Sequence, residues 1–209
     1  GSTQLIDCLP FHPFSPLLLL FPFCFHRMTL FRNLKLMTAI DNKGGIGKDC
    51  SVPWNLPTDL SWLEMSTRLT LDPTKRNAVI FGRRTYFSIP QSDRPYGGRL
   101  NIVLSSSWSD EDQSTNTVIF VRNWMEIERV LEEFSSDLEN VWILGGSEVY
   151  RHALENDLVE EVRITEIEEQ FDCDAFFPKL DWRGRFDIET TRRMRENGIG
   201  YSMTIMRRR

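Results

Sequence analysis

The sequence lacks the features that mark several other classes of protein. Its strongest apolar run, residues 17–25, is broken by Pro22 and falls well short of the ~20 residues that cross a bilayer. No Lys or Arg precedes this run, as a signal peptide requires. The chain has 25 Lys and Arg against 30 Asp and Glu, a net charge of -5 that argues against general nucleic-acid binding. We therefore expect neither a membrane nor a nucleic acid as partner.

Cysteine is also scarce, and its spacing excludes two kinds of stabilising site. The four cysteines lie far apart, without the paired spacing of a zinc site or a disulfide framework: Cys8, Cys24, Cys50 and Cys173. We expect no bound metal. A reducing compartment, the cytoplasm, is the simplest location for such a chain.

The length and composition predict one soluble domain. A chain of 209 residues with 41% hydrophobic and 26% charged residues can bury one sizeable core. Residues 1–27 differ from the rest because they are rich in Phe, Pro and Leu. Gly1-Ser2 resembles a cloning scar and Met28 is a candidate natural start, although an atypical targeting peptide stays open. We assign residues 1–27 to a non-core N-terminal extension and residues 28–209 to the domain.

Short apolar runs alternate with helical patterns from residue 34 onward. The apolar runs predict strands at 34–40, 78–81, 100–104, 118–121 and 141–144. The patterns between them predict helices at 58–69, 84–89, 124–134 and 147–154. Residues 159–168 and 199–206 alternate apolar and polar side chains, as antiparallel edge strands do. The expected fold is α/β, with a mostly parallel central sheet, an antiparallel C-terminal edge hairpin and about four flanking helices.

One acidic residue, Asp59, stands at a predicted helix start in apolar company. Its neighbours in the sequence are Trp54, Leu56, Leu60, Trp62 and Leu63. A carboxylate in such surroundings is costly to bury unless a cation or a proton donor meets it, which makes it a candidate for substrate recognition. The alternative is a structural role, because acids after a proline at a helix start satisfy free backbone N–H groups.

The glycine-rich loop before Asp59 resembles a phosphate-binding loop but does not match one. No Ser or Thr follows Lys48, and the next residues lead to Pro53-Trp54 rather than into a helix. Glycines on one side and Pro53-Trp54 on the other predict a mobile flap, residues 44–54, that closes over a small ligand. An ordinary glycine-rich connector is the alternative.

Four predicted strands end in residues that suit an anion. One ends at Gly82 and is followed by two arginines and a threonine, and another ends at Gly145-Gly146 before a helix. Two more end near Ser105 and Arg122. Ligands of open α/β sheets gather at the carboxyl ends of the strands, so a phosphate-rich nucleotide is the economical explanation.

An ordered set of motifs resembles the dihydrofolate reductase family over residues 34–206. The set comprises Ala39, GIGK at 45–48, PWNLPTDL at 53–60, FGRRTYFSIP at 81–90, RPYGGRLNIVLS at 94–105, WILGGSEVY at 142–150, VRITEI at 162–167 and FFP at 176–178. Each piece alone is weak, but their order and spacing make an accidental match improbable. No thymidylate synthase region follows, so the chain resembles the single-function form.

The resemblance implies NADPH-dependent reduction of 7,8-dihydrofolate to 5,6,7,8-tetrahydrofolate, which supports one-carbon metabolism and nucleotide synthesis. Hydride passes to C6 while N5 is protonated. The implied catalytic residues are Asp59, which anchors the pterin ring, its partner Thr165, and Trp54, with water as the proton source for N5. The implied partners are dihydrofolate and antifolate inhibitors, and we expect a monomer.

The resemblance also implies the binding residues. Arg99 matches the arginine that holds the α-carboxylate of the folate glutamate tail, and the remaining substrate positions are Met37, Ala39, Leu60, Leu63, Ile89, Leu144 and Tyr150. Arg83, Ser105 and Arg122 correspond to the 2'-phosphate site. The full cofactor set is Ala39, Ile46, Gly47, Lys48, Gly82, Arg83, Arg84, Thr85, Leu104, Ser105, Ser106, Arg122, Gly145, Gly146, Ser147, Glu148 and Val149.

Two departures and two backbone expectations accompany the resemblance. Leu63 stands where many members carry phenylalanine, and Tyr96 where an aliphatic residue is common. The family suggests cis peptide bonds at Gly145-Gly146 and Arg94-Pro95. Two other functions stay open: a reductase of the same fold that acts on another heterocycle, such as a pyrimidine of flavin synthesis, and a catalytically silent nucleotide-binding protein. The combination of Asp59 with Arg99 favours folate.

Overall fold

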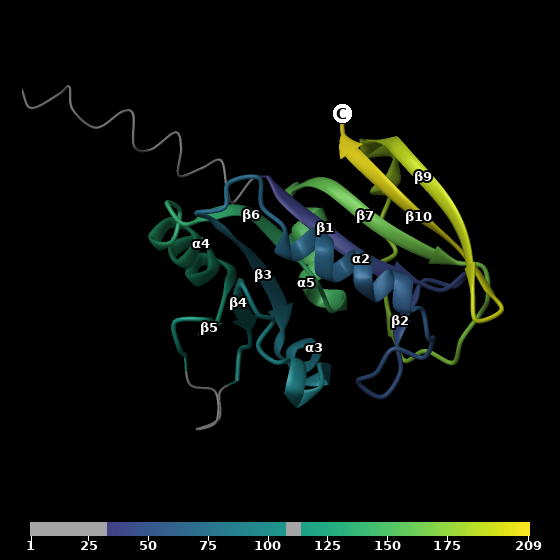
Figure 1. The fold of residues 1–209 in the computed structure, drawn as a ribbon, viewed down its shortest axis with the longest axis horizontal. Coiled ribbons are helices and arrows are strands. Elements are labelled where there is room, and N and C mark those ends of the chain that lie inside the picture. Colours follow the sequence, from purple (N-terminus) through teal and green to yellow (C-terminus); the bar gives the residue numbers. More distant parts are fainter. Residues whose placement is uncertain (1–32, 108–113) are drawn as a thin grey trace, which may run out of the picture.

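The computed structural model describes residues 33–107 and 114–209, which form an α/β domain around one eight-stranded sheet (Figure 1). The strands follow the order β5 (Val118–Val121), β4 (Arg99–Leu104), β3 (Arg76–Gly82), β6 (Leu138–Ile143), β1 (Leu34–Ile40), β7 (Val159–Ile167), β10 (Ile199–Arg208) and β9 (Phe186–Glu196). The strands from β5 to β7 are parallel, whereas β10 runs antiparallel to both β7 and β9. The predicted fold class is confirmed. The proposed extension, residues 1–27, lies outside the described residues.

Four α-helices in the described residues cover the two faces of the sheet: α2 (Pro57–Arg68), α3 (Arg83–Ser88), α4 (Trp124–Glu133) and α5 (Ser147–Glu155). α2 and α3 pack on one face, while α4 and α5 pack on the other, and Figure 1 shows α2 in front of the sheet with α5 behind it. Local sequence explains the helix starts. Proline opens α2, where its missing N–H costs nothing, and the Asn123 side chain accepts a hydrogen bond from the Glu126 N–H to cap α4.

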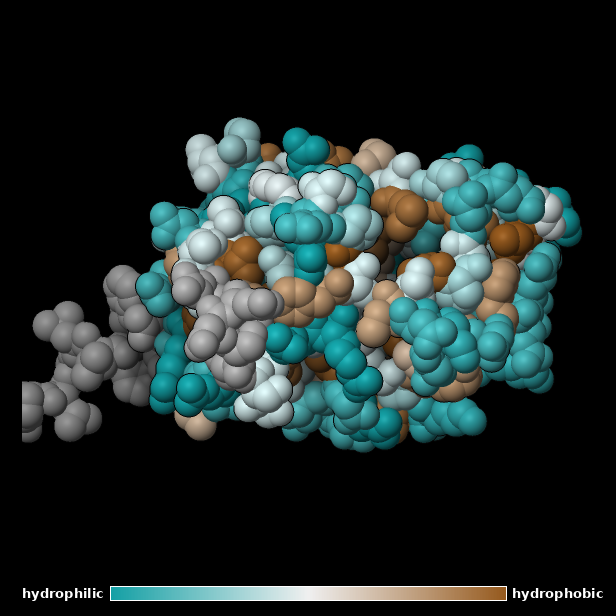
Figure 2. All heavy atoms as spheres, turned by 90° about the horizontal axis from the view of Figure 1, so that it is seen from below, coloured by the Kyte–Doolittle hydropathy of each residue, from teal (hydrophilic) through white to brown (hydrophobic). Residues whose placement is uncertain are grey.

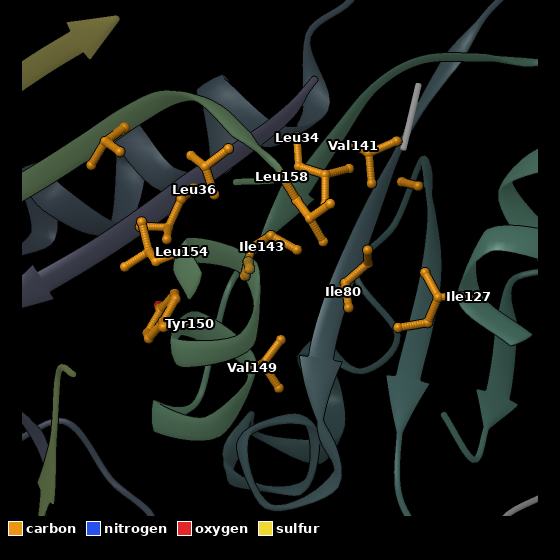
Figure 3. Close-up of a cluster of buried hydrophobic side chains, with 14 of the residues drawn as sticks. Leu34, Leu36, Ile80, Ile127, Val141, Ile143, Val149, Tyr150, Leu154 and Leu158 are labelled. Atoms are coloured by element: carbon orange, nitrogen blue, oxygen red, sulfur yellow. The ribbon is translucent and has the colours of Figure 1, made fainter. Parts of the chain in front are cut away.

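The larger core lies between the sheet and the helices α4 and α5. Figure 3 shows its side chains, including Leu36 of β1, Ile80 of β3 and Ile127 of α4, all of which are fully buried. Most side chains of the parallel strands are buried, which explains the short apolar runs of β3 and β5, whereas β7 keeps an alternating sequence although it is parallel to β1. None of the helices in the described part of the chain is long and apolar enough to span a membrane.

The C-terminal part differs from the sequence prediction in two ways. Residues 159–168 were expected at an antiparallel edge, but β7 lies inside the sheet, parallel to β1 on one side and antiparallel to β10 on the other. Strand β9 was not predicted, because most of its side chains are polar and exposed and leave no apolar alternation. An Asn197-Gly198 turn with positive φ at both residues joins β9 to β10, as in common two-residue hairpins.

The predicted flap is partly a strand. Residues Gly45–Gly47 form β2, which pairs antiparallel with β8 (Ala175–Phe176). The Asp41 carboxylate, which is buried, accepts hydrogen bonds from the N–H groups of Lys43, Gly45 and Phe171 at 2.7–2.9 Å. Asp41 therefore connects the start of the glycine-rich loop to Phe171, in the segment that precedes β8. Whether residues 44–54 move over a ligand stays a prediction.

Candidate active site

Asp59 lies in the first turn of α2, with its side chain directed at the sheet. The residue is only 9% exposed, and its Oδ1 accepts a hydrogen bond of 2.6 Å from the Thr165 hydroxyl on β7. Thr165 is itself fully buried and lies opposite Ala39 of β1 in the parallel ladder. The sequence prediction of an Asp59–Thr165 pair is confirmed.

Burial raises the pKa of Asp59 from its ordinary value of 3.8 to about 6. Loss of hydration is the largest cause, since it disfavours the charged carboxylate. The Thr165 hydroxyl acts in the opposite direction by donating to the carboxylate, and the negative charge of Glu196 adds to the rise. At neutral pH the group is mostly ionised and ready to accept hydrogen bonds.

Glu196, at the end of β9, reaches the start of α2 from the C-terminal hairpin. Its carboxylate accepts hydrogen bonds from the Thr58 N–H at 3.1 Å, from the Thr58 hydroxyl at 2.9 Å and from the Tyr201 hydroxyl at 3.3 Å. These contacts supply a distant cap for the helix that carries Asp59. Sequence analysis missed Glu196, because nothing in the local pattern connects it to a helix about 140 residues earlier.

A further polar contact holds α2 against the sheet. The Arg163 guanidinium on β7 donates to the Ser66 hydroxyl at 2.8 Å and lies 4.9 Å from the centre of the Trp142 ring. Together with the Thr165–Asp59 bond, this contact fixes the helix at two points along β7. The position of Asp59 is therefore set by both ends of α2.

An apolar cluster lies on the same face of the sheet as Asp59. It brings together four of the predicted substrate residues: Met37, Leu63, Ile89 and Leu144. Tyr96 and Trp62 also pack against this cluster. Leu60 is 59% exposed, as a residue at the rim of a cleft would be, and Ala39 packs on the neighbouring cluster that contains Trp54. Four predicted substrate residues therefore belong to this cluster, whereas Leu60 and Ala39 lie outside it.

Two predicted site residues have structural contacts beyond those expected. The hydroxyl of Tyr150, a buried side chain of α5, donates to the Met37 carbonyl at 2.9 Å and ties the helix to β1. Trp54 is buried with Leu56, and its ring centre lies 5.5 Å from that of Phe171. Trp54 therefore anchors the end of the glycine-rich loop in the core.

Arg99 begins β4 and is buried beneath the C-terminal half of α2. Its guanidinium donates to the Thr67 hydroxyl and to the Glu64 carboxylate, both at 2.7 Å, and to the Gly97 carbonyl at 3.1 Å. It also lies 4.6 Å from the centre of the Tyr96 ring. The contact with Glu64 was not foreseen from the sequence.

The glycine turns after β3 and β6 lie side by side. The Gly82 N–H donates to the Gly145 carbonyl at 2.7 Å. A Cβ placed on Gly146 would lie 3.0 Å from the Thr85 hydroxyl oxygen, and one on Gly145, where φ is +106°, would crowd Tyr150 at 3.1 Å. The peptide bonds Gly145-Gly146 and Arg94-Pro95 are both cis, as expected. The structure therefore brings the two turns into direct contact at the starts of α3 and α5.

Three more of the predicted cofactor residues, Leu104, Glu148 and Val149, line a cavity. Figure 2 views the molecule from the side on which α3 lies in Figure 1, where a mostly hydrophilic surface has apolar side chains in its recesses. This cavity has a volume of about 290 Å³ and is lined by Leu104, Trp124, Glu148, Val149, Arg151, His152 and Glu155. The rings of Trp124 and His152 stack with their centres 4.3 Å apart. Leu104, Glu148 and Val149 were predicted from the sequence, whereas the stacked pair Trp124 and His152 was not.

The other predicted cofactor residues lie at the ends of strands, at helix starts and in the predicted flap. Ser105 is half-buried, and Ser106 and Arg122 are exposed, at the ends of β4 and β5. Ser147 begins α5, and Arg83 and Arg84 begin α3. Lys48 follows β2 and forms an ion pair of 3.3 Å with Asp172, while Ile46 packs against the larger core. The described residues contain no cluster of His, Cys, Asp or Glu that could hold a metal ion.

Comparison with known proteins assigns this arrangement to a family. A family model described as dihydrofolate reductase matches residues 33–208. The chain belongs to the dihydrofolate reductase family. It is 41% identical over 145 residues to the dihydrofolate reductase of Drosophila melanogaster, covering 69% of this chain and 79% of that protein. It is 39% identical over 155 residues to the dihydrofolate reductase of Aedes albopictus, covering 71% and 81%.

Bifunctional relatives also match. The chain is 38% identical over 181 residues to the bifunctional dihydrofolate reductase-thymidylate synthase 2 of Arabidopsis thaliana, which covers 81% of this chain but only 30% of that protein. The expected resemblance to dihydrofolate reductase is confirmed by both kinds of relative. As a member of this family, the chain is an oxidoreductase that uses a nicotinamide cofactor.

Proposed function

We propose that this dihydrofolate reductase homologue reduces 7,8-dihydrofolate to 5,6,7,8-tetrahydrofolate with NADPH. The observation that carries the proposal is the buried Asp59 carboxylate, held by Thr165 at the border of an apolar cluster. A pterin ring has an apolar body and, at one end, an amino group and a ring nitrogen that can pair with a single carboxylate. Asp59 and the cluster provide both complementary surfaces.

Asp59 acts by orientation and by charge. With a pKa of about 6 it is mostly ionised at neutral pH, so it accepts two hydrogen bonds from the 2-amino group and the N3 side of the pterin. The Thr165 hydroxyl fixes the carboxylate in place by donating to its Oδ1. The negative charge favours proton uptake by the pterin, with water as the donor to N5.

The residues at the two glycine turns fit a dinucleotide phosphate. Glycine at position 146 leaves room beside Thr85 that a Cβ would fill, and no described side chain caps the N-terminus of α5, so its N–H groups suit a phosphate. Arg84, Thr85 and Ser147 are suited to hold the pyrophosphate. When bound, the cofactor supplies the hydride that reduces C6.

Three residues at the strand ends favour NADPH over NADH. Arg83, Ser105 and Arg122 lie where β3, β4 and β5 end, and they offer two guanidinium groups and a hydroxyl. An additional phosphate dianion on the ribose would gain charge-assisted hydrogen bonds from them. Arg99, at the opposite side of the apolar cluster, is suited to bind the α-carboxylate of the folate glutamate tail.

The test is the absorbance change of NADPH in the presence and absence of dihydrofolate. The wild-type chain should oxidise NADPH only when dihydrofolate is present. Asp59→Asn should lower kcat/KM at pH 7.5 by about a hundredfold or more, because the asparagine can no longer supply the negative charge.

The matched control is Asp137→Asn, which makes the same chemical change at an exposed residue just before β6. That variant should retain wild-type kinetics. Absence of dihydrofolate-dependent NADPH oxidation in the wild-type chain contradicts the proposed function. Equal activity of Asp59→Asn and Asp137→Asn contradicts the role of Asp59.

A further inference from the structure

Arg99 is paired with an acidic residue of its own chain at the position where a substrate carboxylate is proposed to bind. The Arg99 side chain is 2% exposed, whereas the side chain of Glu64 is 43% exposed and lies 2.7 Å away. Arg99 is thus buried in the protein, whereas Glu64 is partly exposed to solvent. Glu64 is the partner that can move.

The hydrogen bonds of Arg99 with described residues leave two of its N–H donors for a second carboxylate. An arginine side chain has five N–H donors, of which contacts with described residues use three, to Gly97, Thr67 and Glu64. One donor remains on each terminal nitrogen of the guanidinium. A ligand carboxylate that binds there must either share the guanidinium with Glu64 or replace it.

Glu64 has a second cationic partner, Arg68. Arg68 lies one turn further along α2, and its Nη1 is 3.6 Å from Glu64 Oε1. Its side chain is 64% exposed, so it can follow the carboxylate as it moves. Residues four apart on a helix face each other, so Glu64 can release Arg99 and keep Arg68 with a small side-chain rotation.

We propose that Glu64 is an exchangeable counter-ion of Arg99, which a carboxylate-bearing substrate displaces towards Arg68 when its tail binds. This inference rests on the proposed function, because it concerns how that substrate's tail is recognised. Glu64 keeps the buried guanidinium neutralised while the site is empty and weakens tail binding by competing for it. Glu64 therefore sets how strongly the enzyme discriminates between tail-bearing and tail-less dihydropteridines.

The experiment compares two substrates in the NADPH assay: dihydrofolate, and 6-methyl-7,8-dihydropterin, which has no glutamate tail. Glu64→Gln should lower KM for dihydrofolate by about threefold to tenfold, since the glutamine competes without a negative charge. KM for the tail-less substrate should not fall with it, so the ratio of the two values changes. The change should shrink at ~0.5 M salt, which screens exposed charges.

A second variant tests the exchange from the other side. Arg68→Gln removes the cation that receives Glu64, so KM for dihydrofolate should rise by about twofold to fivefold. Because Arg68 is exposed, this variant tests the proposal even if Glu64→Gln folds poorly. The matched control is Glu133→Gln, which changes an exposed acid at the end of α4 and should leave the KM ratio at the wild-type value.

Three outcomes would contradict the proposed exchange of Glu64. An unchanged or increased KM ratio of dihydrofolate to dihydropterin in Glu64→Gln overturns the exchange, as does a lower dihydrofolate KM in Arg68→Gln. If the wild-type chain turns over neither substrate, the proposed function fails and the exchange fails with it. Turnover of both substrates with an unaltered ratio in Glu64→Gln overturns the exchange alone.

Discussion

Replacing Asp59 with asparagine should stabilise the folded protein at neutral pH while it lowers the catalytic activity. The carboxylate is buried, and burial raises its pKa from 3.8 to about 6. An asparagine has nearly the same shape, and its side-chain oxygen can still accept the hydrogen bond from Thr165. The substitution therefore removes the cost of a buried charge without opening a cavity.

The size and sign of the effect follow from the two pKa values. Below pH 3.8 the carboxyl is protonated in both the folded and the unfolded chain, so its ionisation costs no stability. Between pH 3.8 and about 6 the unfolded chain releases the proton first, and the folded state loses stability as the pH rises. Above pH 6 the full cost is about 3 kcal/mol, which asparagine avoids.

The measurement is urea unfolding of the wild type and of Asp59→Asn at pH 4 and at pH 7.5. Subtracting the two free energies of unfolding at each pH cancels the titration of all other groups. The advantage of the variant should be larger at pH 7.5 than at pH 4 by about 2 to 3 kcal/mol. If the difference between the two proteins is the same at both pH values, Asp59 does not have a raised pKa and this account of the site is wrong.

Three further variants test the pH dependence of the activity and the choice of cofactor. Thr165→Val should raise the pKa of Asp59 further, because the hydroxyl that favours the carboxylate is lost, and should move the acidic limb of the kcat/KM profile to higher pH. Glu196→Gln should move the same limb to lower pH, because it removes a negative charge that opposes ionisation; shifts in the same direction for both variants would contradict this reasoning. Arg122→Gln should raise KM for NADPH by about tenfold through loss of a charge-assisted hydrogen bond. KM for NADH, measured in the same assay, should change much less, and equal changes would place Arg122 away from the 2'-phosphate.

Much of the fold could be predicted because burial leaves a local pattern. Most side chains of the parallel strands are buried, so the sequence shows short apolar runs such as residues 78–81 in β3 and 118–121 in β5. Helix starts such as Pro57 and Asn123 have their own local chemistry. By contrast, β9 is largely polar and exposed, and only its pairing with β10 makes it a strand.

The site was predicted only as far as its residues carry local signals or family motifs. Asp59, Arg99 and the glycine turns stood out by type and by position. Glu64 looked like any exposed helical acid, and its role became visible only when folding placed it 2.7 Å from Arg99. Glu196 gave no signal either, since it meets Thr58 from the opposite end of the chain.

The sequence by itself determined which segments are buried, in what order strands and helices alternate, and which residue types are available at the strand ends. Only the tertiary structure decided which charges face each other: Asp59 with Thr165 and Glu196, and Arg99 with Glu64 rather than with solvent. The physical reason is that apolar burial repeats along the chain with the period of a helix or strand. A polar pair between distant elements is a single contact, which depends on the packing of the whole sheet and leaves no periodic trace in the sequence.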